Sequence, residues 1–199
     1  MKLTEDQNGN SALEILRHFY PEETPLRKML LKHSFQVCRK ALQILRSPAC
    51  PALQLDRDTV IVGALLHDLG IGCCHAADIF CTGPEPYIAH GILGARMLRE
   101  YAGRTGKQME RYARICERHT GSGLTAEDIR RQHLPLPEQD YLPETPEEKL
   151  ICLADKFFSK SGSMKEKSLP QITRSMQKFG PGAVSRWQKL CRDFGIEIQ

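Results

Sequence analysis

Apolar residues recur at helical spacing along almost the whole chain, and this periodicity constrains the fold more than any other feature. We find no convincing run of alternating apolar and polar residues, which would indicate a half-buried strand. A chain of 199 residues can bury one substantial core and is short for two ordinary domains. The sequence therefore predicts a single all-α domain whose helices bury their apolar faces against one another.

Capping and turn residues set the boundaries of the predicted helices. Pro21 ends the first helix, because the residue before a proline disfavours helical dihedral angles. The segment Thr145-Pro-Glu-Glu148 starts a later helix with a capping threonine, a proline in the first turn and a glutamate that completes a capping box. The predicted helices cover about residues 11–19, 25–45, 59–66, 87–101 and 107–119, a short stretch from 125, a helix from 146 through Asp155, and two shorter helices separated by Gly180-Pro-Gly182. We expect loops at residues 70–86 and 134–146.

The composition narrows the class of protein. Hydrophobic residues make up 41% and charged residues 26%, as in soluble globular proteins. The first residues are polar and acidic, and no apolar stretch approaches the ~20 residues needed to cross a bilayer, so we expect a cytoplasmic protein that does not insert into a membrane. The eight cysteines are expected to be reduced, because disulfide scaffolds mainly serve small secreted domains. The run Cys73-Cys74-His75, with Cys81 beyond, lacks the paired spacing of structural zinc motifs and is a weak candidate for a second metal site.

Positive charge is concentrated in the last part of the chain. From Lys156 onward there are nine Lys or Arg residues against three acidic ones, which gives this part a net charge of +6. The whole chain has a net charge of +4, so the remainder is near −2. Such a basic end could attract ligands that carry phosphate, although a solvated surface without a partner is the more common explanation. No aromatic interleaving or groove-reading motif indicates nucleic-acid binding.

Four histidines and two aspartates fall on the apolar faces of predicted helices. They are His33, His67, Asp68, His90, His119 and Asp155. A buried carboxylate without a partner is costly, and a buried imidazole needs partners for both nitrogens. One histidine of this kind is more often a hydrogen-bonded core residue than a ligand, and this interpretation stays open for His90 or His119 taken singly. All six would satisfy one another if they converged on a metal, and imidazole with carboxylate suits iron, manganese, zinc and related divalent ions.

The adjacent His67-Asp68, with a histidine one helix earlier and an aspartate far downstream, resembles the H…HD…D signature of the HD superfamily of metal-dependent phosphohydrolases. The segments Ala64-Leu-Leu-His-Asp-Leu-Gly70 and Leu153-Ala-Asp-Lys156 extend the resemblance over about residues 26–158. It implies an HD-domain helical bundle at residues 25–160, an N-terminal helical extension at 1–24 and C-terminal helices at 161–199 packed on the same domain. His90 and His119 resemble the branch with two metals, which includes symmetrical diadenosine-tetraphosphate hydrolases. An uncharacterised HDIG-type group is still more similar and leaves the substrate open.

The resemblance also implies a ligand set. One metal would be held by His33, His67, Asp68 and Asp155, and a second by Asp68, His90 and His119, so that Asp68 bridges the two. His67 and Asp68 would be the catalytic pair. We expect iron, with manganese, cobalt, nickel and zinc as alternatives. Many relatives have lysine after the HD-x-G motif, where this chain has Ile71, and this departure affects substrate contacts rather than metal binding.

The expected reaction is hydrolysis of a phosphoester or phosphoanhydride, with a nucleotide as the expected small-molecule substrate. Lys156, Lys160 and the loop glycines Gly121 and Gly123 are candidates for contacting phosphate, and the alternative for each is an ordinary helix-end lysine or cap. A di-iron oxygenase of the HD fold is a second hypothesis, because some such enzymes have a similar ligand set, and oxygen dependence would separate the two. A non-catalytic HD-type interaction module ranks last, since such modules commonly lose their ligands.

Overall fold

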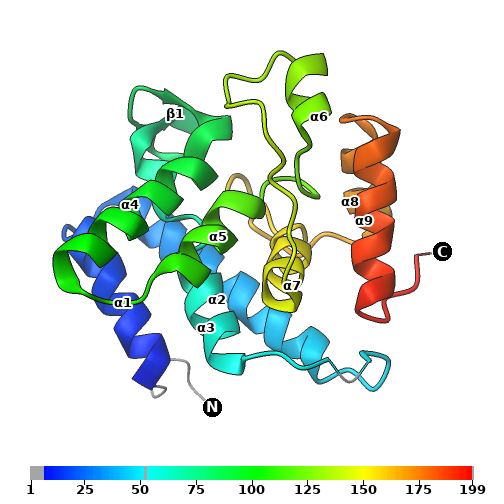
Figure 1. Cartoon of the computed structure of the whole chain (residues 1–199), viewed down its shortest axis with the longest axis horizontal. Helices are drawn as coiled ribbons and strands as arrows, with labels where there is room; N and C mark the ends of the chain where they lie inside the picture. The colour runs from blue at the N-terminus through cyan, green and yellow to red at the C-terminus, as the bar shows by residue number, and fades with distance from the viewer. Residues whose placement is uncertain (1–6, 52, 199) are drawn as a thin grey trace.

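The structure is a computed structural model, and it describes residues 7–51 and 53–198 (Figure 1). The described residues are mostly helical. Their α-helices are α1 (Gln7–Phe19), α2 (Pro25–Leu45), α3 (Arg57–Leu66), α4 (His90–Thr105), α5 (Glu110–Arg118), α6 (Ala126–Arg131), α7 (Pro146–Asp155), α8 (Leu169–Gln177) and α9 (Pro181–Asp193). Short 3₁₀ helices lie at η2 (Leu69–Cys73), η3 (Ala77–Ile79) and η4 (Tyr87–Ala89).

A small three-stranded sheet corrects the prediction of a strictly all-α fold. Strands β1 (Cys74–Ala76), β2 (Cys81–Thr82) and β3 (Glu85–Pro86) occupy the segment expected to be a loop. Their order is β2-β1-β3, with β1 antiparallel to β2 and parallel to β3. Strands of two or three residues are too short to produce an alternating pattern, which explains why the sequence did not reveal them.

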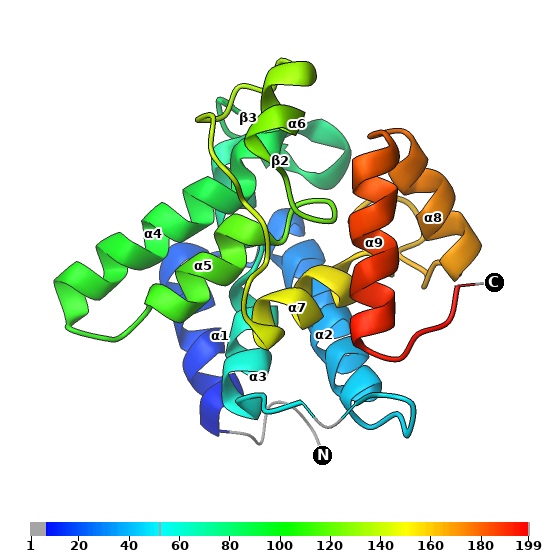
Figure 2. The same ribbon diagram turned by 45° about the vertical axis from the view of Figure 1, so that its right-hand side comes forward.

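Helix α3 occupies the centre of the helical core, as its uninterrupted apolar sequence predicts. Residues 59–66 are all buried, and α3 packs against α1, α2, α5 and α7 (Figure 2). Asp56 caps the helix by accepting the N–H of Asp58. At the other end of α3 come His67 and Asp68, so the most deeply buried helix delivers this pair to the interior.

The glycine at position 70 allows two segments of backbone to approach closely. A Cβ atom added to Gly70 would lie 2.2 Å from the carbonyl oxygen of His90 and 2.3 Å from the backbone nitrogen of Gly94. Any side chain here would therefore push η2 away from α4. The contact places the turn after Asp68 directly against the helix that begins with His90.

The C-terminal helices α8 and α9 lie side by side and contact the rest of the chain through Trp187 (Figure 2). The indole is fully buried, and its ring centroid lies 6.3 Å from that of Phe157, just after α7. Its Nε1–H donates to the hydroxyl of Thr173 on α8, at 3.0 Å. Burial of a tryptophan with its polar atom satisfied favours a stable junction between these helices and α7. No helix in the described part of the chain is long and apolar enough to span a membrane.

Candidate metal centre

The six histidines and aspartates singled out in the sequence meet at one place in the interior. Each of the five helices α2, α3, α4, α5 and α7 contributes a side chain, either from within the helix or from a residue next to its end. All six residues are buried: His33, His67, Asp68, His90, His119 and Asp155. They form two groups, within each of which the potential ligand atoms lie within 4.8 Å of one another.

The first group contains His33, His67, Asp68 and Asp155. Nε2 of His33 lies 2.9 Å from Oδ1 of Asp155 and 3.3 Å from Oδ2 of Asp68. Nε2 of His67 lies 3.2 Å from Oδ2 of Asp68 and 3.6 Å from Oδ1 of Asp155. Two imidazoles and two carboxylates therefore face a common point.

The second group contains Asp68, His90 and His119. Oδ1 of Asp68 lies 3.5 Å from Nε2 of His90 and 3.3 Å from Nε2 of His119, and these two nitrogens are 3.1 Å apart. Asp68 thus presents one oxygen to each group, Oδ2 to the first and Oδ1 to the second.

Three of the histidines are oriented by the same local hydrogen bond. The Nδ1 atoms of His67, His90 and His119 each lie 2.7 Å from the carbonyl oxygen of the residue three positions earlier in the chain. An Nδ1–H that donates to a carbonyl leaves Nε2 as the atom with a free lone pair. The helical backbone therefore sets both the orientation and the tautomer in which these rings would bind a metal.

Several polar atoms in the cluster lack the partners that buried groups require. Nε2 of His67 and both carboxylate oxygens of Asp68 are buried without a hydrogen bond, although charged groups surround them. Buried polar atoms are almost always satisfied, and a carboxylate between imidazoles is satisfied when a cation lies among them. The donor set of nitrogen and oxygen atoms fits divalent transition metals.

Burial and the two carboxylates shift the pKa values of the histidines in opposite directions. Burial lowers the pKa of His33 to about 4, and burial together with His119 lowers that of His90 to about 3. Burial would also lower the pKa of His67, but the Asp68 and Asp155 carboxylates outweigh it and raise this pKa to about 9. Burial would raise the pKa of Asp68, but His67 and Lys160 hold it well below its usual value. Both His33 and His90 are therefore neutral at pH 7, while His67 carries a proton.

Two lysines reach the same cluster. Nζ of Lys160 lies 2.9 Å from Oδ2 of Asp68 and 4.0 Å from Oδ1 of Asp155. Nζ of Lys156 lies 2.7 Å from Oδ2 of Asp155 and donates to the carbonyl oxygen of His119 at 3.3 Å. Ile71, which follows the His-Asp-x-Gly segment, is fully buried in the core. The positive charge beside Asp68 comes from Lys160.

The two glycines proposed to contact phosphate differ in their surroundings. The N–H of Gly123 donates to the carbonyl oxygen of Thr120 within the turn, at 3.0 Å. A Cβ atom added to Gly121 would meet nothing within 4 Å, although its φ of +61° disfavours other residues. Of the two, Gly121 is the one with open space beside its backbone, and the predicted phosphate contact rests on it.

Tyr87 belongs to the site, although the sequence analysis did not single it out. Its ring stacks on the imidazole of His90, with centroids 4.7 Å apart and planes inclined by 19°. Its carbonyl oxygen also orients His90, and Nζ of Lys160 lies 6.0 Å from its ring centroid. The position three residues before a ligand histidine was the signal that could have identified it.

The cysteine-rich segment is separate from the cluster. Neither of the two potential metal-binding groups found in the described residues includes a cysteine. None of the eight cysteines, all of which lie in the described part of the chain, forms a disulfide bond. Burial raises the pKa of Cys74 to about 12, so this thiol is protonated at neutral pH.

The model of the HD domain family matches residues 30–159, within the predicted limits of 25–160. The chain belongs to the HD domain family. This HD domain contains the complete cluster, from His33 to Asp155. The resemblance noted from the sequence is therefore confirmed at the level of the family.

The names of the curated relatives do not agree on one activity. An uncharacterised protein of Methanocaldococcus jannaschii is 33% identical over 144 residues, which cover 72% of this chain and 71% of that protein. Two proteins named tRNA (cytidine(56)-2′-O)-methyltransferase match as well. The protein from Picrophilus torridus is 36% identical over 66% of this chain, and the one from Thermoplasma volcanium 33% over 68%. The matches span only 32% and 34% of those two proteins. We found no solved structure that matches the chain.

Proposed function

We propose that this HD domain is a metal-dependent phosphohydrolase with two divalent ions, iron foremost, and that a nucleotide is its substrate. The observation that supports this most directly is the position of Asp68, whose two oxygens face separate groups of histidines. A carboxylate placed in this way can bridge two ions a few ångströms apart. Symmetrical diadenosine tetraphosphate belongs on the list of nucleotides to test, because His90 and His119 resemble that branch of the family.

The roles of the residues follow from their positions. Bound divalent ions would lower the pKa of a water molecule and neutralise negative charge on the leaving oxygen. Asp68 and His67 hold the centre of the cluster, and the carbonyl contacts keep the imidazoles aimed at it. Lys156 and Lys160, whose ammonium groups already lie beside the aspartates, would attract the phosphoryl oxygens. The backbone of Gly121 would contribute a further donor.

The test combines metal analysis with phosphate release. Protein purified without added metal is analysed for metal content, and the same sample is assayed with a nucleotide panel in air and under anaerobic conditions. We expect about two metal ions per chain and release of phosphate that does not depend on oxygen. About two irons without phosphate release would favour the di-iron oxygenase, and no metal even after reconstitution would favour a non-catalytic interaction module.

His90→Ala should preferentially empty the second metal position. His90 belongs only to the second group, whereas Asp68 belongs to both, so the first group keeps all four of its side chains. We expect metal content to fall from about two ions to about one, as measured by mass spectrometry of the purified protein. His75→Ala is the matched control, because His75 is an exposed histidine on β1 outside both groups. Equal loss of both ions in His90→Ala would contradict the division into two groups.

Metal binding at pH 7 should release a proton from His67. The neighbouring carboxylates raise the pKa of His67 to about 9, so the metal-free protein holds this proton at pH 7 and a ligand imidazole must lose it. The affinity for metal therefore rises with pH until the pH passes about 9, the pKa of His67. Calorimetry of Mn²⁺ binding in buffers of different ionisation enthalpy measures the number of protons, which we expect to be about one. A value near zero would show that His67 is already neutral.

RNA is a second candidate class of substrate. It is favoured by the two relatives named as tRNA methyltransferases and by the excess of basic residues after Lys156. These matches cover only about a third of each relative, and methyl transfer is not part of the proposal. Adding short RNA oligonucleotides with terminal phosphates to the panel tests this class, and faster release from them than from mononucleotides would favour it.

A further inference from the structure

A small cavity with largely apolar walls lies beside the loop that follows His119. Its volume is about 100 Å³. Segments far apart in the sequence form its walls: the start of the α4 region, the 120–124 loop, the end of α6 with the residues after it, and the corner between α8 and α9. The apolar side chains of the wall are Ile88, Leu124, Leu134, Met176, Phe179 and Ala183. We call this space the 120-loop cavity.

The 120-loop cavity is next to the second group of the metal centre. Gly121 lines it two residues after His119, and Ile88 lines it two residues before His90. Because consecutive Cα atoms are about 3.8 Å apart, each of these wall residues lies within about 7.6 Å of a ligand histidine, measured between Cα atoms. The cavity wall and the second group are therefore built in part by the same two short segments of chain, residues 88–90 and 119–121.

The cavity is held in shape by buried polar contacts. The hydroxyl of Ser122 donates to the carbonyl oxygen of Ala183 at 2.9 Å, which ties the 120–124 loop to α9. Arg186 forms an ion pair with the buried Asp128, and both residues line the cavity. This arrangement is built by side chains of α6 and α9, and it does not depend on a ligand.

One donor in this wall has no partner. Nε of Arg186 is buried without a hydrogen bond, while Nη2 of the same guanidinium pairs with Oδ2 of Asp128. Buried donors are nearly always satisfied, so a missing acceptor is consistent with one supplied by a ligand. Apolar side chains thus make up much of the wall, and Arg186 supplies a donor that lacks an acceptor.

We propose that the 120-loop cavity binds a single apolar or aromatic ring in the organic part of the substrate, with a polar atom of that ring facing Arg186. The inference rests on the proposed function, because it assumes a phosphate at the metal centre. A closed cavity of about 150 Å³ holds benzene. The 120-loop cavity has a volume of about 100 Å³ and is open at one side, so it accommodates one ring inserted in part. Phosphates that carry one ring, such as aryl phosphates and pyrimidine nucleotides, are then preferred over sugar phosphates.

The test uses binding, so that it does not depend on turnover. The full chain loaded with Mn²⁺ is titrated by calorimetry with phenylphosphonate and with methylphosphonate, whose P–C bonds resist hydrolysis. Burial of a ring should make phenylphosphonate bind at least about tenfold more tightly. Ala183→Leu should fill the cavity and remove this preference, while the affinity for methylphosphonate stays unchanged. Equal affinities in the unmodified protein, no binding of either compound, or an unchanged preference in Ala183→Leu would overturn the proposal.

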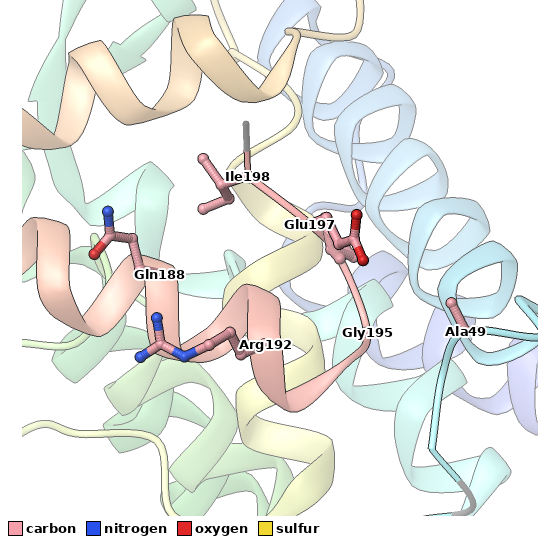
Figure 3. Close-up of a pocket in the computed structure, with 7 residues that line it drawn as sticks. Ala49, Gln188, Arg192, Gly195, Glu197 and Ile198 are labelled. Carbon is pink, nitrogen blue, oxygen red and sulfur yellow. The ribbon is translucent and has the colours of Figure 1, made fainter.

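A control and a second variant guard against effects on folding. Ala49→Leu makes the same change in an exposed groove between the end of α2 and the C-terminal residues (Figure 3), and it should keep the preference. This groove lies beyond Leu45, which is twelve residues or about 18 Å along α2 from His33. Phe179→Ala removes one side chain of the cavity wall. Because Phe179 is 46% exposed, this change should lower the affinity for phenylphosphonate alone without unfolding the chain.

Failure of this proposal can be told apart from failure of the proposed function. If the protein releases phosphate but binds both phosphonates equally, only the assignment of the 120-loop cavity is wrong. If it prefers phenylphosphonate but releases no phosphate from any substrate, the cavity assignment holds and the hydrolase function is wrong.

Discussion

Replacing Asp68 with alanine is expected to remove both metal ions and to lower the rate of phosphate release by at least a factor of about a thousand. Asp68 is the only side chain shared by the two metal-binding groups found in the described residues. Its loss also leaves Lys160 without its nearest carboxylate, 2.9 Å away, and so adds an unpaired positive charge where a cation must bind. Bound metal would lower the activation free energy by several kcal/mol, and losing this contribution corresponds to the expected change in rate.

The measurement is metal content and phosphate release on the same preparation of the Asp68→Ala variant. Asp78→Ala is the control, because Asp78 is an exposed aspartate on η3 outside both groups. Circular dichroism verifies that each variant is folded. Retention of two metal ions in Asp68→Ala would show that Asp68 is not the bridging ligand, whatever happens to activity.

Trp187→Ala is expected to lower the free energy of unfolding by about 3–5 kcal/mol. The indole is fully buried, so its removal leaves a cavity between α9 and the residues after α7 and deprives Thr173 of a donor. Leu53→Ala is the control, because Leu53 is 37% exposed and its truncation should change stability by less than about 0.5 kcal/mol.

Denaturant unfolding of the same variants tests whether the C-terminal helices share one domain with the rest, as we propose for residues 161–199. In that case the unmodified chain unfolds in one step, and Trp187→Ala shifts the whole transition. Tryptophan fluorescence and circular dichroism should report the same midpoint in the unmodified protein. Two separate transitions, only one of them sensitive to Trp187→Ala, would contradict the single domain.

The helical part of the fold was predictable because its signals are local. Thr24 caps α2 and Thr145 forms the capping box of α7, and these contacts depend on residues within one turn. The boundary predicted at Pro21 also agrees with the end of α1 at Phe19. By contrast, the helix expected from residue 87 begins with the 3₁₀ turn η4, and α4 itself starts at His90.

The site was predictable to the extent that burial follows from helical periodicity. An ionisable residue such as His33 on an apolar stripe must have a partner in the core, and this argument selected all six residues of the cluster. Which side chains face each other, and which oxygen of Asp68 faces which group, depend on how the helices pack. The 120-loop cavity was outside the reach of sequence patterns, since its walls come from residues as distant as Ile88 and Arg186.

The meeting of five helices at one cluster also has a mechanical consequence. His33 and Asp155, 122 positions apart in the chain, are joined at their side chains, and a shared ion would close this long loop as a cross-link does. An ion that binds the folded chain and not the unfolded one stabilises the fold in proportion to the logarithm of its free concentration. The supply of metal would then govern how long each molecule survives heat and proteases.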